Sequence, residues 1–240
     1  MPFFKSFTVS LLIPIVLSAG EPINVLFIGN SYTGQNGLAH LVAAMATELP
    51  DPVQLRVSTH TPGGCTFQRH MIEGKAIEKV KSFQPNFVVL QEQSQMPVFE
   101  PVQTLNAGRA LGQLVQEAGA TPVLYMTWAR KHIPDQIKAL SETYFALGEK
   151  LQAPVAPVGL AWSKALREKP EWALHKKDKS HPNQQGSYLA ACVILATILN
   201  VDITELPDKG FTLKSVTSEQ AAYYQKLAQQ HAESVEGSAP

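Results

Sequence analysis

Short apolar runs alternate with longer amphipathic segments along almost the whole chain. Five of these runs have the length and the β-branched content of strands, at residues 23–31, 54–59, 87–90, 122–127 and 155–160. Strands that alternate with helices in this way build a parallel sheet with helices on both of its faces. The sequence therefore predicts a three-layer α/β/α sandwich with about five parallel strands in a flavodoxin-like order.

Helices are predicted at residues 37–49, 67–83, 102–118, 134–151, 162–168, 184–199 and 217–231, where apolar residues recur at helical spacing. Gly119 stands where glycine commonly ends a helix. The fifth strand is short and rich in proline, which fits the edge of a sheet. Residues 169–180 are charged and show no periodic pattern, so they are predicted to form a loop.

The N-terminus has the pattern of a secretory signal peptide. Lys5 precedes an apolar segment at residues 7–17, and small residues follow it up to Gly20. This segment is shorter than the roughly 20 apolar residues that a membrane span needs, and no other run approaches that length. We expect export to the periplasm or the cell exterior after loss of residues 1–20, one domain at residues 21–231, and a disordered tail at 232–240.

Composition narrows the possible partners. The chain has 20 basic and 20 acidic side chains, and this balance argues against nucleic acid as a partner. Cys65 and Cys192 could pair in an exported protein, but a buried free thiol at Cys192 is equally consistent with its apolar surroundings. No His-x-x-x-His or Cys-x-x-Cys pair indicates a metal site, and no cofactor is predicted. The oligomeric state is left open.

Residues capable of chemistry follow four of the predicted strands. They are Asn30 and Ser31 at the end of the first, Gly63 and Gly64 after the second, Gln91 and Gln93 after the third, and Trp128 and Arg130 after the fourth. Because parallel strands place their carboxyl ends at one edge of a sheet, we expect these residues to meet there. Trp128 and Arg130 are predicted to line the mouth of the cleft, with core packing and a solvated charge as the alternative.

The loop at residues 169–180 leads a candidate base to the same edge. Asp178 stands three residues before His181, so its carboxylate can fold back onto Nδ1 of the imidazole and leave Nε2 for a hydroxyl. A serine hydroxyl needs such a base to become a nucleophile. Ser31, Asp178 and His181 are therefore the predicted catalytic triad. His60 and His70 could line the pocket, but neither has a carboxylate at this spacing.

An oxyanion formed at Ser31 would need hydrogen-bond donors that are already in place. The backbone N–H groups of Ser31 and Gly64 are suited to this, together with a side-chain amide at the end of the third strand. Gln93 is preferred over Gln91 because the later residue lies closer to the exposed edge. Both glutamines as purely structural amides are the alternative.

These residues resemble the motif blocks of the SGNH, or GDSL-like, hydrolase superfamily, in the order in which the family carries them. Residues 25–33 are similar to the first block, Gly-Asp-Ser, with Asn in place of Asp, and Gly64 is similar to the glycine of the second. Residues 178–182 match the last block, Asp-x-x-His-Pro, which is the most specific of them. The third block differs, because the family has Gly-x-Asn-Asp where residues 91–94 read Gln-Glu-Gln-Ser.

The resemblance implies a serine hydrolase that needs no metal or organic cofactor. The predicted function is an exported esterase that hydrolyses small acyl esters, acetyl above all, on carbohydrate through an acyl-enzyme. Two alternatives stay open: a catalytically weak or inactive carbohydrate-binding protein on the same fold, and an O-acyltransferase with the same triad. The residues predicted to complete the pocket are Asn30, Gln91, Trp128 and Arg130.

Overall fold

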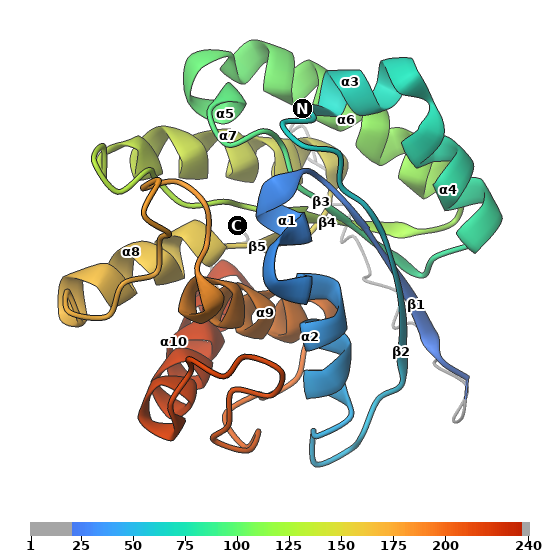
Figure 1. Ribbon diagram of the computed structural model, residues 1–240. Coiled ribbons are helices and arrows are strands. Elements are labelled where there is room, and N and C mark those ends of the chain that lie inside the picture. Colours follow the sequence, from blue (N-terminus) through green and yellow to red (C-terminus); the bar gives the residue numbers. More distant parts are fainter. Residues whose placement is uncertain (1–20, 237–240) are drawn as a thin grey trace, which may run out of the picture.

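The computed structural model describes residues 21–236 and contains a five-stranded sheet in which neighbouring strands are all parallel. The strands are β1 (Ile23–Ile28), β2 (Leu55–His60), β3 (Phe87–Leu90), β4 (Thr121–Tyr125) and β5 (Val155–Ala156). Their order, β2-β1-β3-β4-β5, is that of flavodoxin-like sheets. Helices lie on both faces of the sheet (Figure 1), so the predicted three-layer α/β/α sandwich is confirmed.

Two layers of helices enclose the sheet. The helices are α1 (Ser31–Gly34), the 3-10 helix η1 (Gln35–Gly37), α2 (Leu38–Ala46), α3 (Phe67–Glu73), α4 (Lys75–Phe83), α5 (Met96–Phe99), α6 (Pro101–Glu117), α7 (Gln136–Leu151), α8 (Val158–Glu168), α9 (Gln184–Leu199) and α10 (Ser218–Glu236). Helices α2, α8, α9 and α10 share one core with the sheet, and α3, α4, α6 and α7 share the other. Figure 1 shows these two layers below and above the strands.

The side chains of β1 divide between the two cores. Val25 and Phe27 pack with α2 and α9, whereas Leu26 and Ile28 pack with α6 and α7. All four are fully buried, which accounts for the continuous apolar run in the sequence. The place of β1 between β2 and β3, with both of its faces covered, fixes the point from which the chain enters the candidate site.

Helix α9 coincides with the predicted helix at residues 184–199 and is buried on nearly all sides. It packs against α2, α8 and α10. Asn183 caps its start, because the Oδ1 atom of that side chain accepts a hydrogen bond from the Gly186 N–H at 2.9 Å. The anchored start of α9 holds the segment that carries His181.

Several predicted elements have wrong boundaries. The strand predicted at residues 23–31 ends at Ile28, and the helix predicted at 162–168 begins at Val158. The helix predicted at residues 67–83 is two helices, because Gly74 adopts a left-handed backbone conformation with φ of +71° between them. The strand predicted at residues 155–160 contains only Val155 and Ala156. Pro157 has no N–H for a strand ladder, and α8 begins at Val158.

Helix α10 continues beyond the predicted start of a disordered tail. It ends at Glu236, and Ala232 packs against the core of its layer, which explains why the helix extends past residue 231. The rest of the predicted tail, residues 237–240, and the predicted signal peptide, residues 1–20, lie outside the described residues. No helix within residues 21–236 combines the length and the apolar character needed to cross a membrane.

Candidate active site

The chain leaves β1 in a tight turn that places Ser31 at the first position of α1, where the sequence predicted only a turn. Asn30 caps this short helix, because its Oδ1 accepts a hydrogen bond from the Tyr32 N–H at 3.1 Å. Its Nδ2 group donates to the Cys65 carbonyl at 3.0 Å. Asn30 therefore ties the turn of Ser31 to the loop that follows β2.

Gln91 lies beneath the turn of Ser31 and is completely buried. Its Oε1 accepts hydrogen bonds from the Asn30 N–H at 3.0 Å and from the Thr33 hydroxyl at 2.8 Å. A Cβ atom on Gly29 would lie 2.6 Å from the same oxygen, so glycine is the residue that fits there. Gln91 thus supports the turn from below, and its predicted place in the pocket lining is wrong.

Asp178 and His181 are joined within one tight loop. The Oδ1 atom of Asp178 accepts hydrogen bonds from the backbone N–H groups of Ser180 and His181, both at 2.9 Å, while Oδ2 lies 2.6 Å from Nδ1 of His181. Burial raises the pKa of the Asp178 carboxyl, but these hydrogen bonds outweigh burial and lower the pKa to about 2. The carboxylate is therefore ionised at neutral pH and accepts the Nδ1 proton of the imidazole.

The imidazole of His181 reaches Ser31 across the edge of the sheet. Its Nε2 atom lies 2.9 Å from Oγ of Ser31. Because Nδ1–H points at the ionised Asp178, Nε2 is the acceptor for the serine hydroxyl. The three residues predicted as a triad thus form one continuous chain of hydrogen bonds.

An aromatic stack supports the His181 loop from behind. The rings of Tyr32 and Trp128 are parallel with centroids 4.8 Å apart, and Trp128 stacks on Trp162 at 3.7 Å. The Tyr32 hydroxyl lies 2.5 Å from the Ser180 hydroxyl, and Nε1–H of Trp128 donates to the Ser180 carbonyl at 3.0 Å. Trp128 is only 1% exposed, so its predicted place at the mouth of the cleft is wrong. It packs in the core and positions the residue before His181.

Three hydrogen-bond donors near Ser31 have no acceptor within residues 21–236. They are the backbone N–H groups of Ser31 and Gly64 and the side-chain NH₂ of Gln93. Oε1 of Gln93 accepts from the N–H groups of Gln95 and Met96 at 2.7 and 3.2 Å, which assigns the amide orientation and leaves NH₂ available. Gly64 holds its backbone at φ of +64°, a conformation that favours glycine.

A pocket of about 210 Å³ lies beside Ser31. The residues that line it are Asn30, Ser31, Tyr32, Gly64, Gln93, Ser94, Arg130, Ser180 and His181. The predicted pocket residues Asn30 and Arg130 are thus part of the wall. Sequence reasoning missed Tyr32, Ser94 and Ser180, each of which adjoins a residue that it did identify.

Glu92 is a buried carboxylic acid that sequence reasoning also missed. It is 1% exposed, and its Oε1 accepts hydrogen bonds from the backbone N–H groups of Phe67 at 2.9 Å and Gln93 at 2.6 Å. Burial raises the pKa of its carboxyl to about 7. Phe67 begins α3 just after the loop of Gly64. Glu92 therefore connects this loop, with the free N–H of Gly64, to the segment that carries the free NH₂ of Gln93. A lone acid after a buried apolar run was its only signal in the sequence.

The histidines near the second glycine turn belong to the scaffold. His70 is fully buried, and its Nε2–H donates to the Gly29 carbonyl at 2.9 Å. Burial lowers the pKa of His70 to about 4, so its ring is neutral at physiological pH. The ring of His60 lies edge-on to it, with centroids 5.4 Å apart.

The described part of the chain contains no group of three His, Cys, Asp or Glu side chains that could hold a metal ion. Cys65 and Cys192 are both buried free thiols, so the open question of their pairing is answered. The groups that the structure brings together at the site are Ser31, His181 and Asp178 and the donors around them.

The fold is that of the SGNH hydrolases, as comparison with solved structures shows. A proposed SGNH hydrolase from Slackia heliotrinireducens aligns with a TM-score of 0.65 over 74% of this chain and 100% of that chain, at 24% sequence identity. A DUF4886 family protein from Bacteroides uniformis gives a TM-score of 0.68 over 88% and 94%, at 17% identity.

A third similar structure is a catalytic mutant of Axe2, an acetylxylan esterase from Geobacillus stearothermophilus, with a TM-score of 0.62 over 73% and 94% of the two chains, at 14% identity. No protein-family model and no curated protein sequence matches this chain. The predicted resemblance to the SGNH superfamily is therefore confirmed at the level of the fold.

Proposed function

We propose that this protein is a serine esterase that hydrolyses small acyl esters. The observation that carries the proposal is the hydrogen-bonded chain from Ser31 through His181 to Asp178, with lengths of 2.9 and 2.6 Å. Both lengths are within the reach that general acid–base catalysis needs. Esterases among the solved structures with this fold, such as Axe2, agree with this reading.

In the first half-reaction, Oγ of Ser31 attacks the carbonyl carbon of the ester while its proton passes to Nε2 of His181. Asp178 stabilises the resulting imidazolium through Nδ1–H. The carbonyl oxygen becomes an oxyanion, which accepts hydrogen bonds from the N–H groups of Ser31 and Gly64 and from the amide of Gln93. Collapse of this intermediate breaks the bond to the alcohol, which leaves with the proton from His181.

The second half-reaction removes the acyl group from Ser31. A water molecule gives a proton to Nε2 of His181 and attacks the acyl carbonyl, and the same donors stabilise the second oxyanion. Collapse breaks the bond between the carbonyl carbon and Oγ, and the proton returns from His181 to Ser31. The acid is released and the hydrogen-bonded chain is restored.

The proposed substrate is an acetyl or similarly small ester on a carbohydrate. No aliphatic side chain is among the described residues that line the pocket, and its volume is about 210 Å³. Polar groups of this kind suit the hydroxyls of a sugar better than a long hydrocarbon chain. Axe2, with the same fold, is an acetylxylan esterase.

A comparison of substrates and of one variant tests this function. The wild-type protein should release acetate from acetylated oligosaccharides and hydrolyse para-nitrophenyl acetate with a higher kcat/KM than para-nitrophenyl palmitate. Ser31→Ala should lower kcat by a factor of roughly 10⁴ or more. Equal or faster turnover of the palmitate would contradict the substrate, and full activity of the variant would contradict the enzymatic role of Ser31.

The proposal includes export of the protein. Its basis is the sequence of residues 1–20, in which one Lys, a short apolar segment and small residues follow one another. N-terminal sequencing of protein recovered from the periplasm or the medium should find a chain that begins close to Glu21. A protein that keeps Met1 and stays in the cytoplasm would contradict export.

A further inference from the structure

Arg130 is the one side chain of the pocket wall with a permanent charge. It follows the end of β4 and lines the same pocket as Ser31 and His181. None of the other lining residues is acidic. A guanidinium thus lies in the site where the ester would bind, without a carboxylate in the pocket wall to neutralise it.

The Arg130 guanidinium also has no ion-pair partner elsewhere in the described part of the chain. Ion pairs within residues 21–236 involve other cations, namely Arg69, Lys138, Lys164, His181 and Lys209. In addition, Nε of Arg130 is buried and has no hydrogen-bond partner. A charged group without an acceptor is costly to bury, so a ligand that brings an anionic acceptor to this guanidinium from the pocket would be stabilised.

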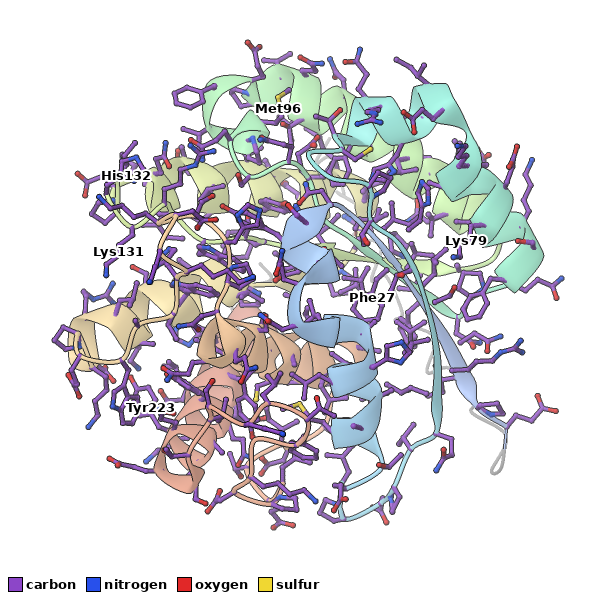
Figure 2. The ribbon with its side chains drawn as sticks, in the orientation of Figure 1. Phe27, Lys79, Met96, Lys131, His132 and Tyr223 are labelled. Carbon is purple, nitrogen blue, oxygen red and sulfur yellow. The ribbon has the colours of Figure 1, made fainter. Side chains whose placement is uncertain are left out.

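The surroundings of this arginine add positive charge. Lys131 is exposed, and its backbone N–H donates to the Lys179 carbonyl at 3.0 Å, which joins it to the His181 loop. Figure 2 shows Lys131 on the segment that precedes α7. The exposed basic residues of the segment that carries His181, residues 169–181, are Lys176, Lys177 and Lys179. This segment has two carboxylates, Glu171 and Asp178, and Asp178 is already bonded to His181. Because the lysines outnumber these carboxylates, the edge of the site attracts anions although the whole chain has balanced charge.

We propose that the pocket binds an ester that itself carries a carboxylate, and that the Arg130 guanidinium pairs with this carboxylate. The planar fork of a guanidinium matches the two oxygens of a carboxylate through parallel hydrogen bonds. Because Arg130 and Ser31 line one pocket, this pair would orient the ester carbonyl toward Oγ. The inference rests on the proposed esterase function and narrows its substrate to an acylated sugar acid or a similarly charged ester.

Matched esters separate the role of Arg130 from general activity. We would measure kcat/KM for meta- and para-acetoxybenzoate and for their uncharged methyl esters, using the wild type, Arg130→Gln and Arg130→Lys. Arg130→Gln should reduce kcat/KM for the carboxylates about tenfold to a hundredfold more than for the methyl esters. The kcat/KM of Arg130→Lys for the carboxylates should lie between those of the wild type and Arg130→Gln. Lysine keeps the positive charge but lacks the planar guanidinium that can form two parallel hydrogen bonds.

Two further variants control for charge alone. Arg109→Gln removes an exposed arginine on α6, and Lys131→Gln removes the exposed cation next to Arg130. Both should change the preference for carboxylate esters much less than Arg130→Gln does. The inference would be overturned if Arg130→Gln lowered kcat/KM equally for the carboxylates and for their methyl esters. It would also be overturned if Lys131→Gln changed the preference for carboxylates as much as Arg130→Gln does. Absence of hydrolysis of every ester by the wild type would instead contradict the proposed function.

Discussion

Oγ of Ser31 and Nε2 of His181 lie 2.9 Å apart although 150 residues separate them in the chain. The turn after β1 holds the first and the loop before α9 holds the second, and both meet at the carboxyl edge of the sheet. Each is fixed by its own surroundings: Gln91 and Asn30 support the serine turn, and Asp178 supports the imidazole. The geometry is therefore built into the folded chain before any ester binds.

Asp178→Asn should lower kcat by about 10⁴ with little change in KM. The asparagine carbonyl can still accept the N–H groups of Ser180 and His181, so the loop keeps its shape. Its NH₂ group, however, cannot accept the Nδ1 proton, and the imidazole then presents the wrong tautomer to Ser31. Steady-state kinetics measure the effect, with Asp202→Asn as the control because that exposed aspartate accepts similar turn hydrogen bonds. Equal activity of the two variants would contradict the role of Asp178.

Gln93→Glu tests the side-chain donor at the proposed oxyanion hole. A glutamate can still accept the N–H groups of Gln95 and Met96, but it has no NH₂ to donate. Loss of one such donor should lower kcat by roughly 10² to 10³ while KM changes far less. Thermal unfolding should confirm that the loop remains intact. A variant with normal kcat would assign Gln93 a structural role, which the sequence also allowed.

Gly29→Ala should destabilise the protein and reduce its activity. The new Cβ would lie 2.5 Å from Oγ1 of Thr33 and 2.6 Å from Oε1 of Gln91, so the bonds that hold the serine turn must shift. Overpacking of this kind costs about 1–3 kcal/mol. Urea unfolding measures the loss, and Gly63→Ala is the control because a Cβ there meets nothing within 4 Å. Equal stability of the two variants would contradict the close packing around Gly29.

Glu92→Gln should remove a pH dependence of stability. The pKa of Glu92 is raised from 4.5 to about 7 in the folded protein, so between these values the unfolded chain releases a proton that the folded protein keeps. The free energy of unfolding of the wild type should therefore fall by up to about 3 kcal/mol as pH rises through this window. The variant should lack this contribution, because glutamine does not titrate.

Urea unfolding of the wild type and Glu92→Gln at pH values below and above this window measures the difference. Glu117→Gln, at an exposed position of α6, is the matched control and should follow the wild type. If Glu92→Gln shows the same pH dependence as the wild type, Glu92 does not titrate in this window and its raised pKa is contradicted.

The sheet and several helices could be predicted because their signals are local. The apolar runs of β1, β3 and β4 are bounded by polar or glycine residues, and α9 matches its predicted range. The break at Gly74 could not be predicted, because a glycine can continue a helix or take a positive φ, and its surroundings decide which. The early end of β5 likewise depends on where Pro157 meets the start of α8.

The parts of the site likewise differ in whether their contacts join residues that are close in the sequence or far apart. Asp178 and His181 interact within one short loop, so their spacing alone predicted the contact. Gln91 instead accepts hydrogen bonds from Asn30 and Thr33, about sixty positions earlier in the chain. Glu92 accepts a hydrogen bond from the backbone N–H of Phe67. No local pattern distinguishes a pocket glutamine or tryptophan from a buried structural one. Gln91 and Trp128 are therefore buried, as the stated alternatives had it, and do not line the pocket.

The reaction of the folded protein with a fluorophosphonate, followed by intact-mass measurement and peptide mapping, tests the central claim most directly. A serine that is activated by His181 should become phosphonylated as part of the same chemistry that attacks an ester. We predict a single adduct on Ser31 in the wild type, and a much slower reaction in His181→Ala. A folded wild-type protein that forms no adduct on Ser31 would contradict the account.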